Sequence, residues 1–320
     1  MKKSDVSRRH FTLLAGTLAA GRIPIGAAAN VSAEEVIGRI QTSLGTERPS
    51  NSSDGFKAGD PNTPVKGIAT TAMATVDVLK RASAAGANLV LTYEPTFFGR
   101  QDGPTPPAAP PPSSAAAQPN GNNARAAAAR MYFGMAADDP VYTAKKAFIE
   151  KNGLVVYRLR DGWRSRKENE MTTGLAESLG WTKYCVKPDD ALYDIPKATA
   201  EGTVGYIRKK LNLRGGLRAV GDRKATVRRV LLFPGLMTPA TMWQRYEETD
   251  LIIAGEVREW ENTHYAADIY TVGEKRGLVT IGRVVSEDPG MRACSEWLKT
   301  VVKEMPAHWI TVGDLYWRAV

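Results

Sequence analysis

The chain has 320 residues, of which 43% are hydrophobic and 24% charged, so it is long enough to bury one large core or two smaller ones. Its formal net charge of +9 falls to +5 when residues 1–29 are set aside, and the remaining basic residues do not form a block interleaved with aromatic side chains. This composition argues against nucleic-acid binding and is typical of a soluble enzyme or binding protein.

Residues 1–30 have the pattern of a twin-arginine signal peptide. The pair Arg8-Arg9 is followed by a short apolar run at 11–20, and the small residues at 26–29 offer a cleavage site. The apolar run is too short to provide a stable membrane span. We therefore predict export by the twin-arginine route to a periplasmic or other extracytoplasmic location; a disordered or helical cytosolic N-terminus is the alternative.

Short apolar runs alternate with segments of helical periodicity, which predicts an α/β fold with largely buried sheets. The runs are bounded by Gly, Pro, Asn or Asp, and the last helical segment has Ser286 or Asp288 as its expected N-cap. In chain order the predicted elements are a helix at 33–44, a strand in VKGIATT, a helix in ATVDVLKRASAAGA, a strand in NLVLT, a helix in DDPVYTAKKAFIEKNG, a strand in LVVYRL, helices in TTGLAESLGW and TVGYIRKKLNL, strands in VRRVLLFPG, DLIIAGEV and GLVTIGRV, and a helix in SEDPGMRACSEWLKTVVK.

The order of these elements suggests two domains. Residues 33–185 together with 250–320 are expected to form the main α/β domain, and residues 186–249 a smaller α/β domain inserted between them. Residues 101–130 are a low-complexity segment dominated by Pro, Ala, Ser and Asn, which cannot pack a core. We expect a mobile insertion there, either a lid over a site or a tolerated surface loop.

The chain has two cysteines, Cys185 and Cys294. An oxidising compartment would permit a disulfide, but the sequence leaves their pairing undecided. Cys294 shares a helical face with Met291 and Leu298, which predicts a buried thiol.

Four predicted strands are followed by an acidic residue. Glu94 follows LVLT, Asp161 follows LVVYRL, Glu256 follows LIIAG, and Glu287 comes shortly after LVTIG. Ligands of open α/β sheets bind beyond the carboxyl ends of the strands. The four carboxylates therefore indicate a site, and carboxylates in one cleft need cations, either metal ions or arginines.

Arginine rather than histidine stands beside these carboxylates. The chain has three histidines, none at a strand end, whereas Arg160, Arg164 and Arg283 lie next to the acidic residues. An arginine cannot bind a metal ion, because its side chain stays protonated and has no lone pair to donate. It can compensate a carboxylate or bind a small anionic ligand.

Five segments of the chain match the motifs of a known family: KAGDPNTPVKGIATT, LVLTYEPTFF, VVYRLRDGWRSR, AGEVREWENTHYAADI and GLVTIGRVVSEDPGMRACSEWL. Through these segments the chain resembles the NGG-interacting-factor-three-like proteins, a family described as dinuclear-metal-centre hexamers and often as homologues of type-two GTP cyclohydrolase. The resemblance covers most of residues 50–320 apart from the insertion, and its exported relatives form a twin-arginine subgroup. It implies the two-domain fold of that family, with a strand-end site, assembly into a homo-hexamer, and two divalent metal ions that activate a water for hydrolysis.

The histidines that the resemblance leads one to expect are replaced in this chain. Close relatives read His-Glu-Pro where residues 93–95 are Tyr-Glu-Pro, and His-Asp-His-Trp-His where residues 160–164 are Arg-Asp-Gly-Trp-Arg. They read Gly-His where residues 282–283 are Gly-Arg. The family's metal positions that remain are Glu94, Asp161 and Glu287, with Glu256 as a further candidate.

We interpret the site as a degenerate one, in which arginine–carboxylate pairs replace the metal ions and no cofactor is expected. Arg160, Arg164 and Arg283 are the compensating or anion-binding groups of a non-catalytic or anion-binding paralogue.

Two alternatives stay open. In the first, a residual metal-dependent hydrolase uses one cation and a water held by carboxylates, with Tyr93, Glu94 and Asp161 as catalytic candidates; the family expectation is one or two divalent ions. In the second, the chain is a purely structural subunit of an oligomer.

Overall fold

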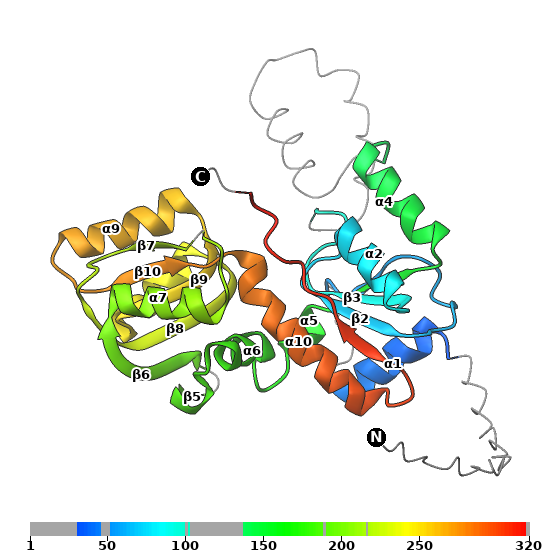
Figure 1. Cartoon of the computed structure of the whole chain (residues 1–320), viewed down its shortest axis with the longest axis horizontal. Helices are drawn as coiled ribbons and strands as arrows, with labels where there is room; N and C mark the ends of the chain where they lie inside the picture. The colour runs from blue at the N-terminus through cyan, green and yellow to red at the C-terminus, as the bar shows by residue number, and fades with distance from the viewer. Residues whose placement is uncertain are drawn as a thin grey trace, which may run out of the picture.

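The computed structural model describes residues 31–45, 52–99, 102, 137–187, 190–215 and 217–317. The predicted signal peptide and, except for Asp102, the low-complexity insertion lie outside these residues. The described elements form two sheets, of five and six strands, on either side of one long helix (Figure 1). Both sheets contain parallel and antiparallel pairs, which confirms the predicted α/β class with mixed, buried sheets.

The first sheet is built from both ends of the chain. Its strand order is β1-β4-β3-β2-β11, with β1 antiparallel to β4 and the other neighbours parallel. The elements of this half are α1 (Ala33–Leu44), β1 (Gly55–Ala58), β2 (Ile68–Thr71), α2 (Val76–Ala84), β3 (Leu89–Thr92), α4 (Pro140–Lys151), β4 (Val155–Arg158), α5 (Asp161–Arg164), α10 (Arg283–Val301) and β11 (Ala307–Trp309).

Helices cover both faces of this sheet, and the side chains of β3 show why. Leu89 and Leu91 pack with α1 and α10, whereas Val90 between them packs with α2 and α4. Successive residues of a strand point to opposite faces, so an unbroken apolar run suits a strand with two covered faces. Cys294 of α10 is fully buried in this core, as predicted, and both cysteines are free thiols.

The second sheet has the order β5-β6-β8-β9-β10-β7, with β8, β9 and β10 parallel. Helices α6 and α7 pack on one face, and α8 and α9 pack on the other. The elements are α6 (Glu170–Leu179), η1 (Thr182–Tyr184), β5 (Cys185–Lys187), β6 (Leu192–Thr199), α7 (Ala200–Lys210), β7 (Arg218–Val220), β8 (Thr226–Met237), α8 (Pro239–Arg245), η3 (Tyr246–Glu248), β9 (Leu251–Val257), the π-helical turn η4 (Glu259–Thr263), α9 (His264–Thr271) and β10 (Gly277–Thr280).

The sheets do not follow the predicted division at residue 250. That division placed β9 and β10 with residues 33–185, but both strands belong to the second sheet, where Ile252 pairs with Leu231 of β8 and Leu278 of β10. The reason lies in the connections: α8 and α9 are short crossover helices, and such crossovers place consecutive parallel strands side by side. The chain returns to the first sheet only through α10 and β11.

Helix α10 packs against both sheets and positions the residues at its own start. It begins at Arg283, one turn before the predicted caps Ser286 and Asp288, and Pro289 lies inside it. A Cβ atom on Gly290 would lie 2.7 Å from Cα of Met171, so glycine lets α10 cross α6 closely. No helix within the described part of the chain is long and apolar enough to cross a membrane.

Candidate functional site

Two arginines bind the carboxylate of Glu94 at the carboxyl end of β3. Arg160 Nη1 donates a hydrogen bond of 2.6 Å to Glu94 Oε1, and Arg283 Nη2 donates one of 2.7 Å to the same oxygen. Glu94 is only 5% exposed. Arg160 follows β4 in the first sheet, and Arg283 follows β10 in the second, so this one carboxylate joins the two halves of the molecule.

Arg283 is the centre of a larger charged network. Its Nη1 donates a 2.8 Å hydrogen bond to Glu256 Oε1 at the end of β9, and its Nε lies 3.4 Å from Glu287 Oε1. Because α10 begins at Arg283, Glu287 lies one turn further along the same helical face. Glu287 is 1% exposed. Three carboxyl groups from three separate elements thus surround one guanidinium group.

The two buried carboxyl groups have opposite pKa shifts. Burial alone would raise the pKa of Glu94, but the charges of Arg160 and Arg283 outweigh it and lower that pKa. Burial raises the pKa of Glu287 well above its ordinary value, and the negative charge of Glu94 raises it further, while Arg283 offsets this only in part. The surroundings therefore favour the ionised form of Glu94 and oppose ionisation of Glu287. Burial opposes the charged form of Arg283, but Glu94 and Glu287 raise its pKa above the ordinary value.

Gly235, near the end of β8, lies close to the carboxyl group of Glu287. Gly235 has φ +82°, and a Cβ atom there would lie 2.8 Å from Glu287 Oε1. Its amide donates to Ser286 Oγ at 2.9 Å, and that hydroxyl donates to the carbonyl of Arg283. Gly235 and Ser286 were not among the predicted site residues; the Pro-Gly pair that interrupts the apolar run of β8 was the available signal.

The ring of the buried Tyr93 packs against the guanidinium group of Arg160. The guanidinium carbon of Arg160 lies 5.0 Å from the centre of the Tyr93 ring, in cation–π contact. Tyr93 is buried, and burial raises its pKa, while the nearby charges of Arg160 and Arg164 act in the opposite direction. Arg164 itself is exposed at the end of α5. Its charge therefore faces solvent close to Arg160 and Tyr93.

Asp161 lies next to the network, but its carboxylate is bound elsewhere. Oδ2 of Asp161 accepts hydrogen bonds from the Ser53 amide at 2.6 Å and the Ser52 hydroxyl at 3.2 Å. Burial raises the pKa of Asp161, yet these hydrogen bonds leave it below its ordinary value. The structure thus gathers Tyr93, Glu94, Arg160, Glu256, Arg283 and Glu287, and it directs the Asp161 carboxylate to the 52–53 loop.

The sequence prediction missed Asp54, which fixes the backbone beneath Arg160. Its carboxylate accepts the amides of Arg160 at 2.7 Å and of Asp161 and Gly162 at 2.8 Å each. Unsatisfied amides at the start of a helix are commonly bound in this way by an acidic side chain. Asp54 directly precedes β1 instead of following a strand, so a search for acidic residues after strands could not find it.

These residues do not fit a metal centre. Within the described part of the chain, no group of three or more His, Cys, Asp or Glu side chains is placed to hold a metal ion. Oε1 of Glu94 already accepts two guanidinium groups, which have no lone pair for a metal.

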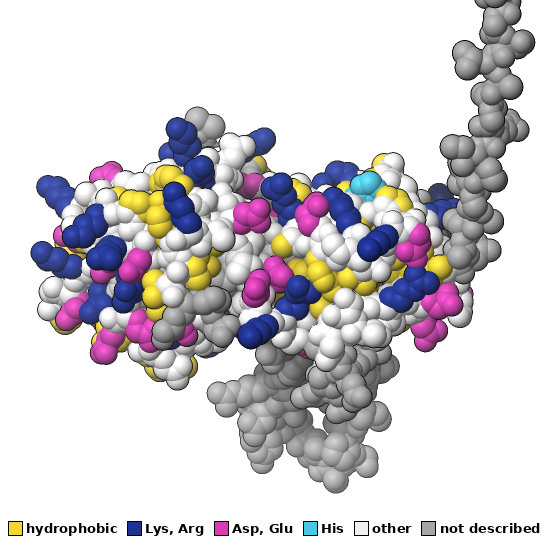
Figure 2. Space-filling model, turned by 90° about the horizontal axis from the view of Figure 1, so that it is seen from below, with side chains coloured by type: hydrophobic (Ala, Val, Ile, Leu, Met, Phe, Trp, Pro, Cys, Tyr) yellow, Lys and Arg dark blue, Asp and Glu magenta, His cyan; other side chains and the backbone are white. Residues whose placement is uncertain are grey.

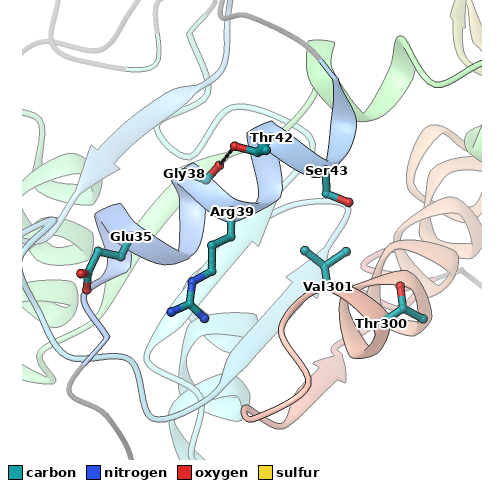
Figure 3. A pocket seen from close by; sticks show the side chains of 7 residues that line it. All are labelled: Glu35, Gly38, Arg39, Thr42, Ser43, Thr300 and Val301. Atoms are coloured by element: carbon teal, nitrogen blue, oxygen red, sulfur yellow. Dashed lines mark hydrogen bonds between the residues drawn. The ribbon is translucent and has the colours of Figure 1, made fainter.

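A spacious hollow on the described surface lies away from this network. It has a volume of about 700 Å³ and is an open depression between α1 and the end of α10 (Figure 3). On the face drawn in Figure 2, basic and acidic side chains are interspersed rather than gathered into one basic area. The hollow shares no residue with the charged network; it is lined by Glu35, Gly38, Arg39, Thr42, Ser43, Thr300 and Val301.

No family model matches the chain, and no curated protein matches it. Solved structures do share its fold. A Bacillus cereus protein related to NIF3 superposes with a TM-score of 0.63 at 13% identity, over 90% of this chain and 99% of that one. The Staphylococcus aureus hypothetical protein SA1388 gives 0.62 at 13% identity, over 91% and 99%.

Reduced HcgD from Methanocaldococcus jannaschii is more distant, with a TM-score of 0.53 at 16% identity, over 87% of this chain and 97% of that one. The matches span nearly the whole of each chain, and they confirm the NIF3-like fold predicted from the sequence. At these identities the similarity establishes the fold alone.

Proposed function

We propose that this chain is a degenerate, metal-poor relative of the dinuclear-metal-centre proteins, and that it binds a small anion such as a phosphate or a carboxylate without hydrolysing it. The observation that carries the proposal is the pair of guanidinium groups on Glu94. By the sequence resemblance, Arg160 and Arg283 stand where relatives have metal-binding histidines. Two guanidinium groups supply part of the positive charge that two divalent metal ions would supply, without offering any ligand to a metal.

The remaining donors of Arg160 favour an anion. Arg160 and Arg283 both donate to the carboxylate of Glu94, and Arg164 lies exposed four residues after Arg160. Arg160 binds Glu94 through Nη1, and 23% of its side chain stays exposed. A guanidinium group has five N–H donors, so Arg160 keeps donors for a second acceptor.

Arg160 and Arg164 provide the exposed edge of this proposed anion site. The planar guanidinium fork binds the oxygens of phosphate or carboxylate groups in pairs. Tyr93 holds Arg160 in position from the buried side. Hydrolysis would need a bound water activated by a metal or by a general base. The carboxylate of Glu94 is already bound by two arginines, and that of Glu256 accepts a hydrogen bond from Arg283.

Calorimetric titration with inorganic phosphate and with acetate tests this function. We expect saturable binding to the wild-type chain that is about tenfold weaker in Arg164→Ala, because one charge-assisted hydrogen bond is lost. Arg208→Ala, which removes an exposed arginine from α7, is the matched control and should bind like the wild type. Equal binding by the two variants, or no binding of either anion to the wild type, would refute the proposal.

One alternative has an observation in its favour. Arg283 connects carboxyl groups that belong to different sheets, so the network could serve only to hold the two halves of an oligomer subunit together. Such a structural subunit would show the stability effects of the network but no anion binding. The residual one-cation hydrolase finds less support, because Asp161, one of its three ligands, is bound to the 52–53 loop.

Location and assembly are proposed from the sequence. The Arg8-Arg9 pair and the following apolar run support export by the twin-arginine route to a periplasmic or other extracytoplasmic location. The family resemblance supports self-assembly, into a hexamer, without a resident metal or other cofactor. Cleavage mapped by N-terminal sequencing of the exported chain and light scattering of the purified protein test these two proposals.

A further inference from the structure

A second pocket lies at the opposite end of the second sheet from the charged network. It has a volume of about 180 Å³ and opens beneath the start of α7, where β8, β9 and β10 begin. Leu251 lines it at the start of β9, whereas Glu256 of the network lies at the end of the same strand. Five strand residues separate the two by about 16 Å, so the pocket is a distinct site.

The inner walls of this pocket are aliphatic. Val204 of α7, Val220 of β7, Val227 of β8 and Leu251 of β9 all line it. Val227 and Leu251 are each only 1% exposed, so the apolar floor belongs to the core of this half. A water molecule occupies about 30 Å³ in the liquid. The pocket therefore has room for an aliphatic side chain and part of a polar head group, but it is too small for a drug-sized ligand.

Charged groups of both signs form the rim. Lys275, Arg223 and Arg276 contribute positive charge, and Glu201, Asp222 and Asp250 contribute negative charge. Asp250 accepts the amides of Arg228 and Arg229, and Arg276 donates to the backbone carbonyls of Tyr246, Glu247 and Thr249. Arg223 and Glu201 form an ion pair with each other, and Asp222 accepts the backbone amide of Lys224, while the Lys275 side chain stands at an exposed position. An apolar floor below a rim of mixed charge suits a ligand with an apolar tail and a zwitterionic head.

The first turn of α7 does not supply an anion site here. The amides of Ala200 and Glu201 donate to the carbonyls of Ala225 and Arg223, and the amide of Gly202 donates to the Thr199 hydroxyl. The helix start is thus already capped by its own loop. A ligand carboxylate would have to find its partner among the rim side chains, which points to Lys275.

We propose that this pocket binds a free α-amino acid with an aliphatic side chain. The side chain would pack on Val204, Val227 and Leu251, with its carboxylate at Lys275 and its ammonium group at Asp222. The proposal is independent of the anion site, because the two sites share no residue.

Titration of the full chain with L-leucine tests this inference, by calorimetry or by shifts of methyl signals in NMR spectra. We expect saturable binding that is lost in Val204→Trp, which fills the pocket, and unchanged in Val272→Trp, an equally large change at an exposed position outside it. Lys275→Gln changes only an exposed side chain and should weaken binding about tenfold. It also serves as the decisive variant if Val204→Trp does not fold.

Three probe molecules each lack one of the three groups of the proposed ligand. 4-Methylpentanoate lacks the ammonium group, isopentylamine lacks the carboxylate, and glycine lacks the side chain. Each should bind about tenfold or more weakly than leucine, because each loses one of the contacts. The inference is overturned if leucine does not bind, if it binds Lys275→Gln as tightly as the wild type, or if glycine binds equally well. Phosphate binding should be unchanged in every one of these variants.

Discussion

Replacing Arg283 by Met should destabilise the fold far more than removing an arginine from the surface. The substitution keeps most of the side-chain volume but leaves Glu94 and Glu287 without the cation between them. Removal of one partner of a buried ion pair costs about 3–5 kcal/mol. Arg160 still binds Glu94, and the contact to Glu256, whose side chain is 43% exposed, contributes about 0–1 kcal/mol. We therefore expect a loss near the lower limit, about 3 kcal/mol.

Urea unfolding of the wild type and of the Arg283→Met, Glu94→Gln and doubly substituted chains measures this loss. The double variant should be less destabilised than the sum of the single ones, by about 0.5–3 kcal/mol, because the Arg283–Glu94 pair can be lost only once. Arg218→Met is the control: its ion pair with Glu259 is exposed, and its loss should cost less than about 1 kcal/mol. If Arg283→Met cost no more than Arg218→Met, the network would not be a buried, coupled one.

Other changes test the parts of the network one by one. Glu287→Gln should leave the free energy of unfolding unchanged near pH 4.5 and raise it increasingly towards pH 8. The pKa of Glu287 is raised in the folded state, so its contribution to stability is complete below the unfolded value of 4.5 and is lost as pH rises towards the folded value, whereas the amide of glutamine cannot ionise. Equal urea midpoints of the variant and the wild type at pH 8 would contradict this. Gly235→Ala should lower the free energy of unfolding by about 1–3 kcal/mol in the same assay, because alanine is strained at φ +82° and its Cβ would meet Glu287 Oε1. A urea midpoint like that of the wild type would show that the backbone at residue 235 can shift away from Glu287. Asp54→Ala should lower the free energy of unfolding by about 2–4 kcal/mol and also weaken phosphate binding, because three backbone amides that position Arg160 lose their acceptor. A loss of stability with unchanged phosphate binding would show that Asp54 does not position the anion site.

The sequence predicted the parallel strands β2, β3, β4, β8, β9 and β10 and the contacts that depend on their ends. It did not predict β1, β5, β6, β7, β11, α5, α8 or α9. Glu94 and Arg160 follow neighbouring parallel strands, β3 and β4, so their meeting at one edge of the first sheet follows from strand direction alone. Arg283 reaches the same carboxylate from another sheet. That contact was expected only through the resemblance, because strand order cannot be read from residue spacing when a chain forms two sheets.

Other features depend on loops and crossover connections, whose structure is harder to predict from residue patterns. The assignment of β9 and β10 to the first unit was wrong because both sheets contain equally apolar strands, and only the short helices α8 and α9 fix the pairing. The direction of the Asp161 carboxylate is set by the amide of Ser53, in a loop with no regular pattern. Ser286 looked like a helix cap, yet Gly282 precedes the helix, and this allows α10 to place Arg283 in its first turn.

Elemental analysis of the purified, folded chain is the most direct test of the central claim. The protein should be expressed in medium supplemented with zinc, iron and manganese, and metal should be counted per chain after gel filtration. Guanidinium groups on the Glu94 carboxylate predict well under one equivalent of any transition metal, and the same result after incubation with each ion. Two firmly bound equivalents per chain, lost on Glu94→Gln substitution, would contradict the account.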